Sequence, residues 1–212
     1  MILLIFPFQA ELDAFLGGAG SGTSGVARTE TKVRGQRVFQ VESEPDWRLA
    51  VCGQGKVEAA LACQILTDAL DPRALMLLGS ATALDPALRV GDIVLADPGI
   101  EWDFDADKPP EFRPRRPFPE PRCVLTGPIL SGDKDVFDPA LKAELRERYG
   151  AKALAWEGAG FHRSLRRSGK TGWEVRVITE EAGEGRLSLA QLKERMAMDF
   201  PALRPVVRAA LL

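Results

Sequence analysis

The sequence has little of the chemistry that metal sites and covalent catalysis require. It contains one histidine, His162, and three cysteines, none of which forms a CxxC pair. A lone histidine cannot complete a zinc-type ligand set with scattered cysteines, so no metal or organic cofactor is expected. No cysteine–histidine or serine–histidine pair stands out, which argues against acyl transfer through a covalent intermediate. We expect Cys52, Cys63 and Cys123 to be reduced, mostly buried thiols and His162 to be a surface or core residue.

The sequence also lacks an excess of one charge and a long apolar run. Lysine and arginine (28) nearly balance aspartate and glutamate (30), so the formal net charge is −2. Such a chain exerts no long-range attraction on nucleic acid or on an anionic membrane. The apolar run at residues 1–6 is too short for a signal peptide or a membrane span, and no other run approaches ~18 residues. These features predict a cytoplasmic protein that binds neither nucleic acid nor a membrane.

Segments typical of strands and helices alternate along the chain. Strands are expected at 1–6, 26–33, 36–41, 47–52, 74–78, 93–96, 123–130, 152–156 and 173–179. Helices are expected at 9–16, 56–70, 139–149 and 157–168, and a last helix begins after Ser188 and is interrupted at Pro201 and Pro205. This alternation indicates a mostly parallel sheet covered on both faces.

Two stretches interrupt the pattern. Residues 98–121 are rich in Pro, Asp and Arg and lack periodicity, so a long surface loop of functional or mobile character is expected. Its basic cluster (Arg113, Arg115, Arg116) has two interpretations, a solvated loop or a site for phosphate or another acid. The Gly/Ser run at 19–25 is expected to be a flexible loop, and the glycine-rich run at 17–25 lacks the GK[ST] ending of a phosphate loop.

Functional side chains are expected where the strands end, because ligands of open α/β sheets gather beyond the carboxyl ends of strands. Acidic and hydroxyl residues follow several of these ends, namely Glu11, Ser80, Asp133, Glu157 and Glu180. Arg176 lies inside an apolar strand, where an unpaired charge is costly, so we expect it to pair with a carboxylate such as Glu11. Carboxylates around a sugar stabilise an oxocarbenium-like transition state, activate water and protonate a leaving group.

Seven short motifs follow one another in an order that resembles a known family. They are 53–60 (GQGKVEAA), 78–81 (LGSA), 90–94 (VGDIV), 102–105 (WDFD), 131–133 (SGD), 156–159 (WEGA) and 176–180 (RVITE). Over nearly its whole length the chain resembles the bacterial methylthioadenosine/S-adenosylhomocysteine nucleosidases of the nucleoside phosphorylase superfamily. The resemblance implies one domain over 1–212 with a three-layer α/β/α sandwich around a mixed, mostly parallel sheet. It also implies a homodimer that hydrolyses the N-glycosidic bond of a purine nucleoside-like substrate.

The resemblance also implies a role for each matching residue. Glu11 would activate the attacking water, and Ser80 and Arg176 would help to hold that water. Glu157 would bind the ribose hydroxyls, and Trp156 would replace a methionine that packs on the ribose.

At the base, Glu180 would protonate N7 of the purine, with Asp133 as an indirect alternative. Ala81, Asp135 and Val136 would complete the substrate-binding site. Two of these positions depart from the family pattern. Glu180 is one methylene longer than the usual aspartate, and Asp135 stands near the position of a phenylalanine that stacks on adenine.

Three functions therefore stay open. The first is hydrolysis, including hydrolysis of a modified nucleoside such as futalosine. The second is phosphate-dependent phosphorolysis, which needs a basic pocket that Arg176 alone does not supply but to which the arginine-rich loop could contribute. The third is a non-catalytic nucleoside-binding role, to which Glu180 and Asp135 point. Each of these residues also has an interpretation without a function. Glu180 and Glu181 could form a solvated acidic turn, Trp156 could belong to the core, and 131–133 could be a simple turn.

Overall fold

The computed structural model describes residues 1–17, 26–105, 107–116, 118 and 124–210. Its central strand is β1 (Ile2–Phe6), which runs parallel to both β4 (Glu44–Val51) and β5 (Ala74–Ala83). The other strands are β2 (Arg28–Val33), β3 (Gln36–Val41), β6 (Ile93–Glu101), β7 (Glu111–Phe112), β8 (Val124–Ser131), β9 (Ala153–Ala155) and β10 (Thr171–Glu180). They form one sheet in the order β10-β6-β8-β9-β5-β1-β4-β3-β2, with β7 beside β6.

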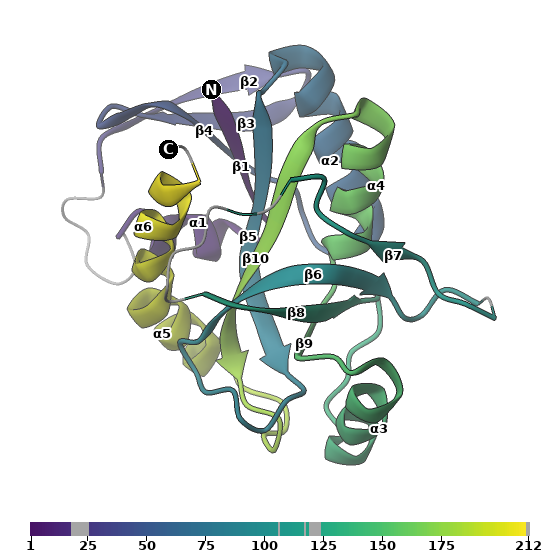
Figure 1. The fold of residues 1–212 in the computed structure, drawn as a ribbon. Helices are drawn as coiled ribbons and strands as arrows, with labels where there is room; N and C mark the ends of the chain where they lie inside the picture. Colours follow the sequence, from purple (N-terminus) through teal and green to yellow (C-terminus); the bar gives the residue numbers. More distant parts are fainter. Residues whose placement is uncertain (18–25, 106, 117, 119–123, 211–212) are drawn as a thin grey trace.

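The sheet closes on itself at one end. β5 pairs with β10 as well as with β9, so β5, β10, β6, β8 and β9 form a continuous ring of strands. In Figure 1, β6 and β8 cross in front of the more upright β5 and β10. Five of the ten strand pairings are parallel and five are antiparallel. The structure thus confirms an α/β fold around a mixed sheet.

Helices cover both sides of the upright strands. The helices α1 (Gln9–Phe15), α5 (Leu189–Asp199) and α6 (Leu203–Ala209) lie together on one side, and α2 (Gly55–Leu70) and α4 (Gly158–Ser168) lie on the other (Figure 1). The helix α3 (Pro139–Tyr149) lies near the end of β9. No helix in the described part of the chain is long and apolar enough to cross a membrane.

The apolar run of β1 packs against both helix layers. Ile2, Leu4 and Phe6 belong to the core on the α1/α5/α6 side, whereas Leu3 and Ile5 belong to the core on the α2/α4 side. Because successive side chains of a strand point to opposite faces, a strand buried on both faces must be apolar throughout. The unbroken apolar sequence of β1 is therefore what places it at the centre of the sheet.

The contact between α2 and α4 depends on Gly160. A Cβ atom at this position would overlap the backbone carbonyl oxygen of Lys56 on α2. Only glycine lets the two helices approach this closely. The close approach matters for function because α2 and α4 both begin at the site described below.

Most expected helices and strands are present, and two expectations were wrong. β5 continues through Gly79 and Ser80 to Ala83, because this segment pairs with β10 along nearly its whole length. Pro98–Glu101 is not loop but the end of β6, which pairs with β8 and β7. The register of β6 shifts between Ala96 and Gly99, and such a bulge accommodates a proline within a strand.

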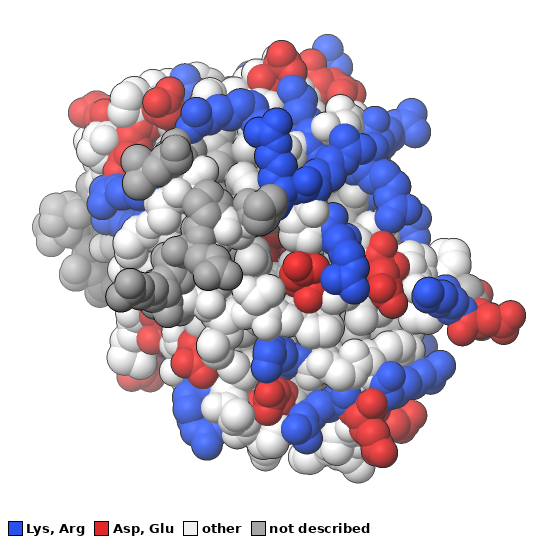
Figure 2. All heavy atoms as spheres, in the orientation of Figure 1, with Lys and Arg blue, Asp and Glu red and all other residues white. Residues whose placement is uncertain are grey.

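The remaining departures are local. Phe112 forms part of β7 and is buried, as is Phe118, so the expected surface loop holds core residues as well. At the C-terminus, Pro201 interrupts the helix as expected with a 3-10 turn (Phe200–Ala202), but Pro205 lies in the first turn of α6 and does not break it. The Gly/Ser run at 18–25 lies outside the described residues. Figure 2 shows charges of both signs on one face, with lysine and arginine gathered over the region of α4.

Candidate active site

A cavity of 280 Å³ lies where β5, β9 and β10 end and α1 begins. Its volume is close to the lower end of small-molecule sites, about 300–1,000 Å³. Eight of the nine expected site residues line it, namely Glu11, Ser80, Ala81, Asp135, Val136, Trp156, Glu157 and Glu180. Arg176 does not line the cavity and lies behind it. The strand ends thus bring together residues that are up to 169 positions apart from Glu11 to Glu180.

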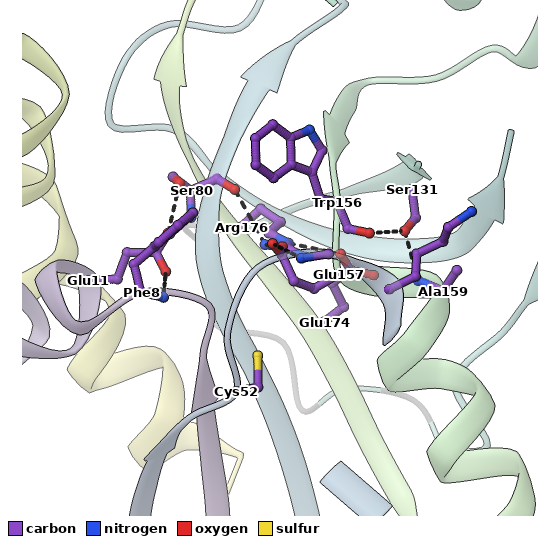
Figure 3. Close-up of polar contacts among 12 residues, drawn as sticks. Phe8, Glu11, Cys52, Ser80, Ser131, Trp156, Glu157, Ala159, Glu174 and Arg176 are labelled. Carbon is purple, nitrogen blue, oxygen red and sulfur yellow. Dashed lines mark hydrogen bonds and ion pairs between the residues drawn. The ribbon is translucent and has the colours of Figure 1, made fainter. Parts of the chain in front are cut away.

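Glu11 is fully buried on the first turn of α1. Its Oε1 accepts hydrogen bonds from the backbone N–H and the hydroxyl of Ser80, both at 2.7 Å, and its Oε2 accepts one from Phe8 N–H at 3.0 Å (Figure 3). Burial raises the pKa of Glu11 to about 7, the charge of Glu157 adds to this, and the Ser80 N–H bond and Arg176 oppose it. A carboxylate with such a pKa can take up and release a proton near neutral pH.

Arg176 pairs with carboxylates, as expected, but its partners are Glu157 and Glu174 and not Glu11. Its Nη1 lies 3.1 Å from Glu157 Oε2, and its Nε donates to Glu174 Oε1 at 2.8 Å. Glu174 and Arg176 are two positions apart on β10, so their side chains leave the same face of the strand. This i, i+2 relation was a sequence signal for the pair. Arg176 Nη2 is buried and has no protein partner among the described residues.

Glu157 lies where two helices begin. It is the N-cap residue of α4, and its Oε1 accepts a 3.3 Å hydrogen bond from Gly55 N–H at the start of α2. The N-terminus of a helix stabilises a nearby negative charge. Arg176 binds the other oxygen of Glu157, and each oxygen keeps a lone pair for a further donor.

Ser131 fixes the turn that carries Trp156 and Glu157. Its hydroxyl donates to Trp156 C=O at 2.7 Å and accepts from Ala159 N–H at 2.9 Å (Figure 3). The segment 131–133 is therefore more than a simple turn. Asp133 accepts from Lys56 N–H at 2.9 Å and so caps α2. It does not line the cavity, and its role as an indirect proton donor stays a prediction.

Glu180, at the end of β10, also lines the cavity. Its Oε2 accepts a 2.6 Å hydrogen bond from the hydroxyl of Thr82 on β5. Val136 is buried in the wall, whereas Asp135 is exposed at the rim. Phe137 adds an aromatic ring to this wall two positions after Asp135, and the sequence did not predict it there.

A segment before and within α5 completes the lining. It contributes Arg186, Leu187, Leu189 and Leu192, none of which was expected at the site. The guanidinium of Arg186 lies over the ring of Phe137, 5.2 Å from its centroid, which is within the ~6 Å reach of a cation–π contact. Leu189 is 66% exposed, so the apolar side of the cavity faces solvent in part.

The basic cluster of the expected loop lies at a different place. Arg113 and Arg115 line a separate hollow of 160 Å³ that shares no lining residue with the cavity. Arg113 pairs with Asp97 at 3.1 Å, and Arg115 donates to Gly169 C=O at 3.0 Å. The backbone of Arg116 accepts from the indole of Trp173. These arginines therefore supply no phosphate pocket to the cavity.

The described cysteines are not nucleophiles, and the described side chains do not form a metal site. Cys52 and Cys63 are buried free thiols, and burial raises the pKa of both, so neither is a thiolate nucleophile. Cys123 lies outside the described residues. Within the part of the chain that the structure describes, no three His, Cys, Asp or Glu side chains are arranged to hold a metal ion.

Comparison with known proteins gives the chain a family context. Residues 4–209 match the family model of the phosphorylase superfamily. The 5′-methylthioadenosine/S-adenosylhomocysteine nucleosidase of Mycobacterium bovis is 34% identical over 111 residues, which are 50% of this chain and 40% of that protein. The aminodeoxyfutalosine nucleosidase of Campylobacter jejuni is 27% identical over 156 residues, 64% of this chain and 68% of that protein. The match therefore spans less than half of the Mycobacterium relative.

One solved structure shows how far the fold agrees. The 5′-methylthioadenosine/S-adenosylhomocysteine nucleosidase of Colwellia psychrerythraea, in complex with adenine, superposes with a TM-score of 0.82 at 22% identity. The superposition covers 99% of this chain and 93% of that one. At this identity the likeness establishes the fold alone.

Proposed function

This chain belongs to the phosphorylase superfamily, and on that premise we propose that it hydrolyses the N-glycosidic bond of a purine nucleoside-like substrate. The observation that carries the proposal is one cavity lined by three glutamates in different surroundings. Glu11 has a pKa of about 7, Glu157 is bound by Arg176 and a helix N-terminus, and Glu180 is bound by Thr82. Carboxylates whose surroundings differ in this way can take different roles, one as the base, one in binding and one as the acid.

The reaction follows from these positions. Glu157 accepts hydrogen bonds from ribose hydroxyls, and the sugar packs beside Trp156. Glu180 donates a proton to the base as the bond from C1′ to the base nitrogen breaks and its electron pair passes to the base. Glu11 takes a proton from a water molecule, whose oxygen forms the new bond to C1′. The products are the free base and the sugar, and the proton left on Glu11 returns to solvent while Glu180 regains one.

Water suits this cavity better than phosphate as the nucleophile. Among the described lining residues Arg186 is the one lysine or arginine, and it lies over Phe137. Phosphate binding ordinarily uses several charge-assisted donors, such as paired arginines. Glu11, by contrast, is well placed to activate water and would repel a phosphate dianion when ionised.

A nucleoside panel tests the function. The protein is incubated with adenosine, inosine, 5′-methylthioadenosine, S-adenosylhomocysteine and aminodeoxyfutalosine, with and without phosphate, and the released bases are separated by chromatography. We expect release without phosphate from at least one nucleoside. Release of base only when phosphate is present would mean that the reaction is phosphorolysis and not hydrolysis. Thermal stabilisation by a nucleoside without any release would indicate a binding role instead.

The assembly and location extend the proposal. A homodimer is supported by exposed apolar side chains, which are Phe104 and, on one face of α2, Val57 and Leu61. Light scattering behind a sizing column tests it, and a monomer at all concentrations would contradict it. A cytoplasmic location is supported by the balanced charge and is tested by cell fractionation.

A further inference from the structure

A chain of buried ionisable side chains runs from the cavity into the protein. Glu174 Oε1 accepts from Arg176 Nε at 2.8 Å, and Glu174 Oε2 lies 3.0 Å from His162 Nε2. Arg176 continues the chain to Glu157, which lines the cavity. Each of these four side chains is less than 5% exposed. Figure 3 shows Glu174 and Glu157 beside Arg176.

The surrounding backbone leaves room for this chain at two glycines. A Cβ atom on Gly158, the first residue of α4, would lie 2.6 Å from Glu174 Oε1. A Cβ atom on Gly99 of β6 would lie 2.8 Å from His162 Nε2. Phe112 stacks on the His162 ring at 5.5 Å with an interplanar angle of 7°. Backbone and ring contacts therefore hold the Glu174 carboxylate and the imidazole in one arrangement.

Glu174 and Glu11 differ in how strongly the positive charge of Arg176 acts on them. Burial raises the pKa of Glu174, but the charges of Arg176 and His162 outweigh burial and hold that pKa below its usual range. Glu174 is thus an ionised partner of Arg176. Glu11 has no cation among its hydrogen-bond donors, and Arg176 is the weakest influence on its pKa. If Arg176 lacked Glu174, its charge would act more strongly on Glu11 and favour the ionised form.

We propose that Glu174, itself held by His162, is a positioning residue that fixes the Arg176 guanidinium against Glu157 and neutralises it, so that Glu11 remains a base able to work near neutral pH. The proposal rests on the hydrolytic function given above, in which Glu11 activates water. Glu174 does not line the cavity and acts through Arg176. The proposal deepens that function by naming a group that limits the effect of the Arg176 charge on the general base.

Several groups determine how Glu11 titrates. Its charged or titratable neighbours are Glu157, Arg176 and the thiol of Cys52, and Glu180 shares the cavity with it. Glu174 is faced by Arg176 and His162. His162 also lines the basic hollow, whose other charged groups are Arg113, Arg115, Arg166 and Lys170. A test must therefore follow Glu11 itself and not overall activity alone.

The test compares the titration of Glu11 in the natural chain and in Glu174→Gln. The side-chain carboxyl carbon of Glu11 is followed by 13C NMR between pH 4 and 9, and its signal is assigned by its loss in Glu11→Gln. We expect the midpoint of Glu11 to fall by about one pH unit in Glu174→Gln, the lower end of the effect of a nearby charge. The acidic limb of the kcat profile should move down with it. An unchanged or raised midpoint would overturn the proposal.

Two further variants keep the result decisive. Glu144→Gln removes an exposed glutamate of α3 and should leave the Glu11 midpoint in place. Gly158→Ala retains every charge but forces the Glu174 carboxylate to move, and the midpoint of Glu11 should again fall. If Glu174→Gln does not fold, Gly158→Ala decides by the same criterion. An inactive natural enzyme would contradict the hydrolytic function. The NMR titration needs no turnover, so the midpoint of Glu11 would still test the positioning of Arg176 in that case.

Discussion

Replacing Glu11 by glutamine separates the catalytic role of this residue from a structural one. Glutamine has nearly the same shape and can still accept the two hydrogen bonds from Ser80 through its amide oxygen. It cannot take a proton from water. General-base catalysis contributes about 10²- to 10⁴-fold to rate, so we expect kcat in Glu11→Gln to fall by about 10³-fold.

The pH dependence of stability gives a second test of the same variant. The pKa of Glu11 is about 7 in the folded protein and 4.5 in its ordinary state, so the folded protein holds this proton when the unfolded chain has lost it. The contribution of the protonated group to stability is present below pH 4.5 and is lost as the pH rises through about 7. At ~1.4 kcal/mol per pH unit, the loss between pH 5 and pH 8 is about 2–3 kcal/mol. Glu11→Gln does not have this loss.

Urea unfolding at pH 5 and pH 8 measures the free energy of unfolding of the natural chain and of Glu11→Gln. We expect the free energy of unfolding of the natural chain to decrease by about 2–3 kcal/mol more than that of Glu11→Gln over this interval. Glutamine turns an N–H group toward the Phe8 N–H, which costs about 1–2 kcal/mol at either pH and cancels in the comparison. Equal pH dependence in the two proteins, together with unchanged kcat, would refute the assignment of Glu11 as the base.

Three further changes test other parts of the account. Trp156→Ala removes a wall of the cavity and should raise KM about tenfold with little change in melting temperature, and an unchanged KM would remove Trp156 from the site. Thr82→Val deletes the hydrogen bond that orients Glu180 and should lower kcat about tenfold, as steady-state kinetics will show; equal kcat would mean that this bond does not matter. Gly160→Ala should destabilise the fold by about 2 kcal/mol or more in urea unfolding, because the new methyl group overlaps the Lys56 carbonyl, and a stable variant would contradict the helix contact.

The sequence placed Glu11, Ser80, Glu157 and Glu180 together because each lies near the end of a buried strand, and strand ends converge in an α/β sheet. It predicted the limits of α3 for a similar local reason. Asp138 caps that helix through a 2.9 Å hydrogen bond from Ala140 N–H, and Gly150 ends it in a left-handed conformation.

The features that were missed depend on pairing between distant segments. Gly79 signals the end of a strand, yet β5 continues because β10 pairs alongside it. Phe137 enters the cavity wall through the path of the loop after β8, which no local pattern fixes. Glu174 resembles a stray polar residue in an apolar strand, and only its contacts with His162 and Arg176 give it a role.

A crystal structure of Glu11→Gln with 5′-methylthioadenosine would test the central claim most directly. The substitution should leave binding intact while turnover is slow. We predict ribose hydroxyls within hydrogen-bond distance of Glu157, the base beside Phe137 and Glu180, and a water molecule at residue 11 facing C1′. A nucleoside bound with its ribose away from Glu157, or bound in the basic hollow beside Arg115, would contradict the account.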